Sequence, residues 1–415
     1  MKNILILGAG TSGTMMANHL RSKLSKNDWN ISIVDKDETH YYQPGFLFLP
    51  FDIYKSKQVK KSIDKFIPKG VNLIRDSINK IDKENDKVIL KDGTELNYDI
   101  LIIATGTEIA PQEIDGMLGD HWHKNVFDFY TFKGAKNLRN KLRKWEGGKL
   151  VVHISEMPIK CPVAPLEFAF LADSYFINKD MRDKVDITYV TPMDGAFTKP
   201  KASKELSYLL EEKNIKIVSN FNIESVDGDN KKIIDYGGKE VEYDLLVTVP
   251  TNMGDEMIER SGFGDDLNYV PTNKATLQTT VKDNIFAIGD ATNIPASKAG
   301  SVAHFEAEIL TENILRFIDN KPLKETFDGH ANCFIETGHG KALLIDFNYT
   351  HEPVTGSFPL PGIGPLKLLK ETHMNHMGKL AFRWIYWNML IKGKHIPFVS
   401  STMSEAGKDL EEELA

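Results

Sequence analysis

The first 35 residues constrain the fold more strongly than any other part of the sequence. A short apolar run at 3–7 is followed directly by the segment GAGTSG at 8–13, and then by a stretch with helical periodicity. A second apolar run, 31–34, ends at Asp35. In such a unit the three glycines permit a tight turn, close approach of the backbone to a pyrophosphate, and packing of the helix on the strand. An acid at this distance is suitably placed to bond a ribose hydroxyl. The order predicts a dinucleotide-binding βαβ unit.

Length and charge bound the remaining possibilities. With 415 residues, 41% hydrophobic and 26% charged, the chain is long enough for two or three globular domains. The net charge of −7 gives no support for nucleic-acid binding. We find no run of about 18 or more apolar residues and no metal-ligating cluster, so we expect neither a membrane span nor a metal site. No secretory signal precedes the first predicted strand, so we expect the mature chain to begin in the cytoplasm.

Two later segments decide between the dinucleotides that this unit could bind. The segment YDILIIATGT at 98–107 and the segment NIFAIGDA at 284–291 are buried strands that end in glycine turns. Together with the first motif they resemble the two-dinucleotide-domain flavoproteins of the glutathione reductase superfamily. That resemblance implies FAD, with Asp290 bonding the ribityl chain. It also implies that a helix after Gly300 points its positive end at the flavin. Lys298 would either add to that positive charge or be a surface lysine near a helix start.

The residues expected to hold FAD lie in five short groups. They are Gly8, Gly10, Thr11, Ser12 and Gly13; Asp35, Lys36 and Pro44; Ala104, Thr105 and Gly106; Gly289 and Asp290; and Lys298 and Ala299.

A degenerate internal repeat predicts a second, related unit. The segment GTELNYDIL at 93–101 recurs as GKEVEYDLL at 238–246, and a further buried strand is expected at 149–154. We therefore predict an α/β fold with two Rossmann-like dinucleotide-binding domains, the second inserted in the first. The expected boundaries are 1–112 with 280–325 for the FAD-binding domain, 113–279 for the second domain, and 326–415 for a C-terminal region.

The second unit lacks the parts that bind a pyridine nucleotide. The strand at 149–154 is followed by SEMPIKCP at 155–162, which has no glycine and two prolines that remove amide donors. Glu156 would face phosphate unfavourably, and no ribose-binding acid follows the next strand at 185–190. We expect the electrons to come from a donor other than NAD(P)H.

The chain has only two cysteines, too few for a structural disulfide framework. Cys161 lies where the missing phosphate loop would be, and Cys333 lies beyond the second flavin segment. The segments KCPVAPLE at 160–167, NCF at 332–334 and YWNML at 386–390 resemble the sulfide:quinone oxidoreductases, in the branch with two redox cysteines. The resemblance covers nearly the whole chain. It implies that Cys161 and Cys333 form a redox pair that sulfide attacks, with electrons passing through FAD to a membrane quinone and sulfur leaving as polysulfide.

Elementary chemistry agrees with this implication, because sulfide oxidation needs an electrophilic sulfur and a thiolate leaving group. Two unrelated buried cysteines would instead behave as small hydrophobes. Glu167 matches a family carboxylate proposed to move protons, although an acid in the first turn of a helix also interacts favourably with the helix dipole. The chain departs from the family at 125–128, which lacks a third cysteine, and at 191–197, which lacks a histidine.

After Phe358 the sequence becomes rich in basic and aromatic residues. Residues 361–398 contain six Lys or Arg and one acid, a formal charge of +5, and residues 380–391 are helical in pattern and dense in aromatics. Such a segment suggests an interfacial helix on an anionic membrane. The alternatives are an amphipathic helix docked on the core, or a dimer contact. Phe334, Phe382 and Tyr386 are the candidates to flank a quinone ring by stacking.

The sequence thus predicts a peripheral-membrane enzyme on the cytoplasmic face of the cell membrane. The rival hypotheses are an NADH:quinone oxidoreductase, a flavoprotein that acts as a redox sensor without turnover, and a soluble sulfide dehydrogenase that reduces a cytochrome. The oligomeric state is left open, a homo-oligomer included.

Overall fold

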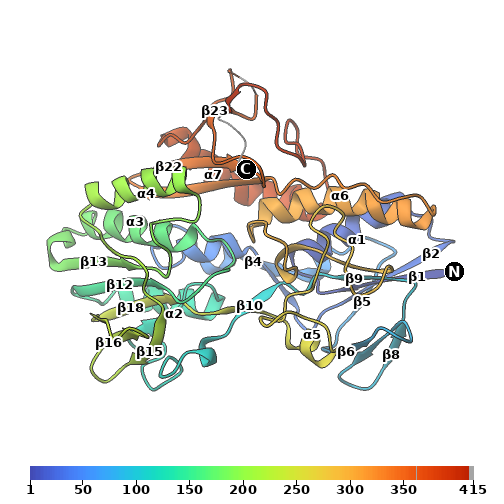
Figure 1. Cartoon of the computed structure of the whole chain (residues 1–415), viewed down its shortest axis with the longest axis horizontal. Coiled ribbons are helices and arrows are strands. Elements are labelled where there is room, and N and C mark those ends of the chain that lie inside the picture. The colour runs from blue at the N-terminus through green and yellow to red at the C-terminus, as the bar shows by residue number, and fades with distance from the viewer. Residues whose placement is uncertain (361, 411–415) are drawn as a thin grey trace.

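The computed structural model describes residues 1–360 and 362–410. Its centre is a pair of five-stranded parallel sheets that lie side by side, with the C-terminal region above them (Figure 1). The central strands of both sheets are buried on both faces and read as nearly continuous apolar runs, as in β9 (Ile100–Ile103) and β18 (Leu245–Val249), whereas the outer strands retain polar residues. Residues 4–7 of the first strand, for example, are at most 2% exposed.

The first sheet has the order β20-β9-β1-β2-β5 and contains the predicted βαβ unit. Its strands are β1 (Lys2–Leu7), β2 (Trp29–Val34), β5 (Asn72–Ile74), β9 (Ile100–Ile103) and β20 (Ile285–Ala287). Helix α1 (Thr11–Lys23) follows β1 directly and packs against α6 (Gly300–Ile318). Strand β20 is distant in sequence but joins β9, so the chain leaves this sheet and later returns to it.

The second sheet has the order β11-β18-β12-β13-β14 and repeats the arrangement of the first. Its strands are β11 (Val126–Phe127), β12 (Gly148–Ile154), β13 (Val185–Val190), β14 (Lys216–Val218) and β18 (Leu245–Val249). Its helices are α2 (Phe132–Leu142), α3 (Ala164–Ile177) and α4 (Pro200–Glu212).

The sequence repeat corresponds to a repeat in the structure. Each parallel sheet is accompanied by a three-stranded antiparallel sheet that leads into one of its central strands. The first is β6 (Ile78–Asp82), β7 (Lys87–Leu90) and β8 (Glu95–Asn97); the second is β15 (Ile223–Asp227), β16 (Lys232–Asp235) and β17 (Glu240–Glu242). The repeated nine residues span β8 to β9 in one unit and β17 to β18 in the other, as expected for two related units.

The C-terminal region lies across both units. It contains the hairpin β21 (Ala331–Gly338) and β22 (Lys341–Phe347), helix α7 (His373–Asn388), and a small sheet of β23 (Thr355–Phe358), β24 (Leu366–Leu368) and β25 (Lys408–Asp409). Strand β21 packs against α3 of the second unit and α6 of the first. The hairpin is therefore held at the junction of the two sheets.

Short elements complete the chain. The strands are β3 (Thr39–Tyr41), β4 (Lys60–Ser62), β10 (Thr107–Ile109) and β19 (Asn252–Gly254), and the remaining helix is α5 (Glu256–Arg260). The 3₁₀ turns are Gln43–Phe48, Ser56–Gln58, Ile63–Lys65, Pro111–Glu113, Arg182–Lys184, Gly289–Ala291 and Leu390–Lys392.

The predicted α/β fold class with two Rossmann-like units is confirmed by the two parallel sheets and by the family match over residues 2–307. Attachment of the C-terminal region to a membrane stays a prediction. The exact domain boundaries stay a prediction, and Pro361 and residues 411–415 of the predicted C-terminal region lie outside the described residues. No helix in the described part of the chain is long and apolar enough to cross a membrane.

Candidate active site

The glycine loop between β1 and α1 has the geometry that its sequence predicts. Gly8 has φ +94°, and a Cβ there would lie 2.6 Å from the Ala104 carbonyl oxygen. A Cβ on Gly13 would lie 1.9 Å from the Gly8 carbonyl oxygen, so only glycine lets α1 start this close to the loop. At Gly10, by contrast, no described atom lies within 4 Å of a Cβ position. This leaves an open approach to the N-terminus of α1, where free amides attract phosphate.

Two strand ends border this loop. Ala104 at the end of β9 donates its amide to the Leu7 carbonyl at 2.9 Å, and Gly106 turns the chain with φ +72°. Gly289, after β20, has φ +70°, and a Cβ there would lie 2.3 Å from the Ser12 hydroxyl. The three glycine-containing segments, which are up to 281 positions apart in sequence (8 to 289), therefore meet at the N-terminus of α1.

The acid after β2 closes the loop from the other side. Asp35 accepts hydrogen bonds from the amides of Ala9 at 2.6 Å and Asp37 at 2.8 Å. Burial nevertheless raises its pKa above the usual value. Of the other predicted residues, Lys36 is exposed, and Pro44 begins the 3₁₀ turn 43–48 and is half-buried.

Two charged residues, Asp290 and Lys298, lie in the segment that follows Gly289. Burial raises the pKa of Asp290, while the charges of Lys298 and Lys160 lower it. Lys298 is 7% exposed, and its ammonium donates to the carbonyls of Asp290 at 3.0 Å and Thr292 at 2.6 Å. The alternative that Lys298 is a surface lysine is therefore wrong. Ala299 caps the N-terminus of α6.

Residues around this junction fit a bound dinucleotide. The Thr105 hydroxyl is buried without a hydrogen-bond partner in the described structure. Buried polar groups are normally paired, so this hydroxyl has the capacity to bond a ligand. Asp290 is half-buried on the turn Gly289–Ala291, where its carboxylate is available as an acceptor. Together with the open space at Gly10, they provide the donor and acceptor set that FAD requires.

Cys161 lies in the loop between β12 and α3, where a nucleotide loop would be in the second unit. Its backbone has φ +48°, unusual for a residue with a side chain, and three hydrogen bonds hold it there. Its amide donates to the Lys298 carbonyl at 2.7 Å, and its carbonyl accepts from the Tyr130 hydroxyl at 3.1 Å and the Ala164 amide at 2.9 Å. The cysteine is thus fixed to the segment that carries Lys298.

Cys333 lies on β21, opposite Ile345 of β22, and both cysteines are thiols in this structure. The two thiols lie close enough for the charge of Cys333 to raise the pKa of Cys161. Burial raises the pKa of Cys161, Glu167 raises it further, and Lys379 lowers it. For Cys333 burial raises the pKa to about 12, with Lys379 lowering it and Glu167 raising it. The same two charged residues therefore act on both sulfurs.

Glu167 and Lys379 form a buried ion pair beside the cysteines. Their side chains are 1% and 11% exposed. Glu167, in the first turn of α3, also accepts from the Glu336 amide of β21 at 2.7 Å. Lys379 of α7 donates to Glu167 and, at 2.9 Å, to the Phe334 carbonyl. Burial would lower the pKa of Lys379, but the neighbouring carboxylates raise it overall. The pair joins the cysteine loop, the cysteine strand and the C-terminal helix.

A second pair continues this network toward the surface. Glu336, which is 1% exposed, lies 2.9 Å from Nδ1 of His376, whose side chain is 19% exposed. The carboxylate of Glu336 also raises the pKa of Lys379. The network therefore extends from the thiols to a side chain that reaches solvent.

The predicted quinone-flanking residues lie in two environments. Phe334 is half-buried, and its ring lies so close to α7 that a Cβ on Gly378 would be 2.9 Å from Cζ. The Phe382 ring, one turn further along α7, lies 6.4 Å from the ring of Tyr42. Tyr386 is instead 1% exposed, and its hydroxyl lies 2.7 Å from the Thr11 hydroxyl and 2.6 Å from His40 Nε2. Its hydroxyl thus contacts the glycine loop and His40, and its ring packs against Tyr42, 4.8 Å between centroids.

Sequence reasoning missed the roles of Lys379, Glu336 and His376. Lys379 counted only as one of the basic residues of the C-terminal segment, and the structure buries it in an ion pair. No sequence feature distinguishes Lys379 from Arg383, the other basic residue of α7. Glu336 and His376 carry no motif, because their proximity arises only when α7 docks on β21.

The chain is similar to known proteins over almost its whole length. The family described as pyridine nucleotide-disulphide oxidoreductase matches residues 2–307. The mitochondrial sulfide:quinone oxidoreductase of Dictyostelium discoideum is 29% identical over 397 residues, which cover 94% of this chain and 86% of that protein. The mouse mitochondrial sulfide:quinone oxidoreductase is 26% identical, with 94% and 86% covered.

Solved structures show the same fold. The X-ray structure of the sulfide:quinone oxidoreductase from Aquifex aeolicus has a TM-score of 0.80 at 21% identity and covers 95% of this chain and 92% of that one. At that identity the match concerns the fold alone.

Proposed function

The chain belongs to the pyridine nucleotide-disulphide oxidoreductase family, and from that premise we propose that it is an FAD-dependent sulfide:quinone oxidoreductase. One observation carries the proposal. The loop that should bind a nucleotide in the second unit instead presents Cys161, next to Cys333 and a shared buried cation, Lys379. The sulfide:quinone oxidoreductases named above, similar over 94% of the chain, support the substrate pair.

The proposed reaction begins on a Cys161–Cys333 disulfide. HS⁻ attacks one sulfur, the S–S bond breaks, one cysteine becomes a persulfide, and the electron pair of the broken bond remains on the other as a thiolate. FAD, when bound, supplies a two-electron acceptor that a quinone can reoxidise. Residues from Gly8 to Gly13, Asp35, Thr105 and Asp290 would hold it. A second HS⁻ would attack the outer sulfur of the persulfide and leave with it as HSS⁻, returning that cysteine as a thiolate. Loss of two electrons from the two cysteine sulfurs to FAD would then re-form the disulfide.

Two charges of the chain act on the thiolates of this reaction in opposite directions, since Glu167 opposes them and Lys379 stabilises them. Burial keeps the pKa of both thiols well above neutral pH, which opposes thiolate formation. The ammonium group of Lys379 lowers both pKa values and so stabilises the leaving sulfur. Glu167 accepts the Lys379 hydrogen bond and fixes that ammonium group in place. We assign Lys379 and Glu167 to this electrostatic and proton-holding role.

We also propose that the C-terminal region rests on a membrane surface. Five of its large apolar side chains are more than half exposed, namely Ile363 (82%), Met374 (51%), Met377 (58%), Trp384 (63%) and Phe398 (71%). Helix α7 docks on the core through Tyr386 and Trp387, so its other face is free. Exposed apolar groups beside basic residues suit an interfacial position, which would give access to a lipid-soluble quinone. The cytoplasmic face of that membrane stays a prediction from sequence.

An anaerobic titration of the purified flavoprotein with sulfide tests the function. We expect sulfide to bleach the flavin absorbance and decylubiquinone to restore it. Cys161→Ser and Cys333→Ser should each abolish bleaching without loss of bound flavin. NADH serves as the comparison donor, and it should bleach nothing. If sulfide leaves the spectrum unchanged, or NADH bleaches it rapidly, the proposal is wrong.

A further inference from the structure

Helix α7 carries two cations on the face that it turns toward the core. Lys379 and Arg383 are four residues apart, so they lie one above the other on the same side of the helix. Lys379 is paired with the carboxylate of Glu167. The guanidinium of Arg383 instead lies over the ring of Tyr54, 4.3 Å from the ring centroid. One cation thus has a carboxylate partner, and the other faces an aromatic ring.

Two polar atoms at this contact have no hydrogen-bond partner among the described residues. They are Nη1 of Arg383 and the hydroxyl of Tyr54, and both are buried. Tyr54 as a whole is 4% exposed, and burial raises its pKa, so the hydroxyl keeps its proton. A guanidinium also keeps its protons at any physiological pH. Because a buried donor without an acceptor costs free energy, the two donors suit a ligand that brings an acceptor oxygen.

The groups around the two donors are mainly aromatic. The centroid of the Phe48 ring lies 4.8 Å from that of Tyr54, and Nζ of Lys379 lies 5.7 Å from the Phe48 ring. Phe382 precedes Arg383 on the helix and faces the ring of Tyr42. Apolar walls with a few fixed donors favour a flat, apolar ligand with oxygen acceptors over a free hydrated anion.

The contact lies between the two ends of the region assigned to FAD. At one end Lys379 acts on both cysteine thiols, and at the other the hydroxyl of Tyr386 lies 2.7 Å from that of Thr11 in the glycine loop. Arg383 stands between Lys379 and Tyr386 along α7. Its neighbour Trp384, on the outer face of the helix, is 63% exposed. The contact therefore borders both the region assigned to FAD and the exposed apolar face of α7.

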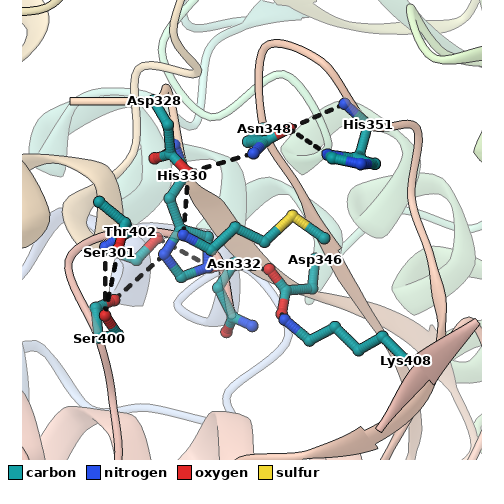
Figure 2. Close-up of polar contacts among 11 residues, drawn as sticks. Ser301, Asp328, His330, Asn332, Asp346, Asn348, His351, Ser400, Thr402 and Lys408 are labelled. Atoms are coloured by element: carbon teal, nitrogen blue, oxygen red, sulfur yellow. Dashed lines mark hydrogen bonds and ion pairs between the residues drawn. The ribbon is translucent and has the colours of Figure 1, made fainter. Parts of the chain in front are cut away.

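The chain beyond α7 is anchored, which holds the helix in place. It returns to the hairpin β21–β22, where the side chains of Lys408, Asp346 and His330 meet (Figure 2). Oδ2 of Asp346 lies 2.7 Å from Nζ of Lys408, and Oδ1 lies 2.8 Å from Nε2 of His330. All three side chains are 5% exposed or less. Since the region is fixed here as well as at Tyr386, Arg383 is a preorganised donor, which lowers the entropy cost of binding.

We propose that Arg383 and Tyr54 bind a carbonyl oxygen of the quinone, with the guanidinium and the phenol hydroxyl as hydrogen-bond donors. Reduction of a quinone to a quinol takes two electrons, which the reduced flavin supplies, and two protons, which come from solvent. Negative charge collects on the quinone oxygens until the protons arrive, and the fixed charge of Arg383 stabilises it. This inference deepens the proposed function and rests on it for the identity of the ligand.

The first test is the binding of decylubiquinone to the oxidised flavoprotein in detergent, followed by quenching of tryptophan fluorescence. Arg383→Met keeps a long side chain without its charge, so Kd should rise about tenfold or more, as for loss of a charge-assisted hydrogen bond. Tyr54→Phe removes one neutral donor, so Kd should rise about three- to tenfold. Arg383→Lys keeps a cation but not the planar fork of donors, so its Kd should lie between those of the unmodified protein and the methionine variant.

The second test separates the two half-reactions. Each variant is reduced with dithionite, freed of excess reductant, and mixed with decylubiquinone without oxygen. The quinone concentration that gives half-maximal reoxidation of the flavin should rise in parallel with Kd in the Arg383 and Tyr54 variants. The rate at which sulfide bleaches the oxidised flavin should stay unchanged, because sulfide reacts at the cysteines.

Two variants serve as matched controls. Lys341→Met removes a cation from the hairpin that packs on α7, but Lys341 is 42% exposed and pairs with Glu371 at 3.0 Å. Tyr243→Phe removes another buried hydroxyl without a described partner, in the second unit. Both should bind decylubiquinone as the unmodified protein does.

An unchanged quinone Kd in Arg383→Met and Tyr54→Phe would overturn the proposal. So would an equal loss of sulfide reactivity in these variants, which would identify a site for an anion. If the methionine variant does not hold flavin, Arg383→Lys and Tyr54→Phe decide the matter. Quinone binding and dithionite reduction need no sulfide. A protein that sulfide does not bleach therefore contradicts the proposed function, whereas normal bleaching with an unchanged quinone Kd contradicts this inference alone.

Discussion

At the scale of single residues, Lys379 has the most consequential position. It is the cation shared by both cysteines, and its charge lowers the pKa of each. Its own partner, Glu167, is 1% exposed, so removing the lysine would also leave a buried carboxylate unpaired.

We therefore expect Lys379→Met to impair catalysis far more than flavin binding. Because the cation lowers the thiol pKa values, its loss raises them, the thiolate fraction at a given pH falls, and the rising limb of the pH–rate profile moves to higher pH. Sulfide-dependent turnover at neutral pH should fall about tenfold per unit of displacement. Steady-state kinetics across pH measure this, with Lys341→Met as control. An unchanged profile with lowered stability would mean that Lys379 is only structural.

The residue scale also shows what sequence could and could not predict. Gly8, Gly13 and Gly289 were recognisable from the sequence. At each position a Cβ would collide with a neighbouring atom, so glycine is required there and recurs at fixed spacing in the motif. The Glu167–Lys379 pair joins residues 212 positions apart and depends on how α7 docks, which no local pattern encodes. Tyr386 belonged to a family-like segment, but only the fold reveals its contact with Thr11.

At the scale of elements, helix α7 has one face buried against the core and one face exposed. Tyr386 and Trp387 are buried, and the Trp387 ring stacks on Phe66 with 5.3 Å between centroids. Met377 and Trp384 are more than half exposed. The two alternatives derived from the sequence, a docked amphipathic helix and an interfacial one, therefore do not exclude each other for this element.

We expect the double variant Met377→Glu with Trp384→Glu to weaken binding to vesicles of anionic phospholipid by about tenfold or more, since each large apolar side chain contributes about 1.5–3 kcal/mol when buried. Flotation of the protein with vesicles measures the effect. Turnover with decylubiquinone in detergent should be retained. Tyr208→Glu is the control, because Tyr208 is 62% exposed on α4, in the second unit. Unchanged flotation of the double variant would argue for a dimer contact on this face.

At the scale of the whole molecule, the two related units and the C-terminal region meet around one centre. The first unit contributes the glycine loop and Asp290, the second contributes Cys161, and the C-terminal region contributes Cys333 and Lys379. The sequence predicted the two units because duplication preserves strand order and the turns between strands. It did not predict how the third region closes over them, because that arrangement depends on contacts between segments far apart in sequence.

Tyr386 tests whether this closure matters for the cofactor. Its hydroxyl lies within hydrogen-bond distance of Thr11 in the glycine loop and of His40, whose pKa burial lowers to about 4, so that His40 is neutral and able to accept. Tyr386→Phe removes both contacts but keeps the ring, and each lost hydrogen bond costs about 1 kcal/mol. We expect FAD affinity to fall about five- to thirtyfold, while alkylation of Cys161 and Cys333 stays unchanged. Fluorescence titration of the apoprotein with FAD measures this. If affinity is unaffected, α7 and the cofactor loop are independent, and the C-terminal region contributes to the centre through Cys333 and its charged neighbours alone.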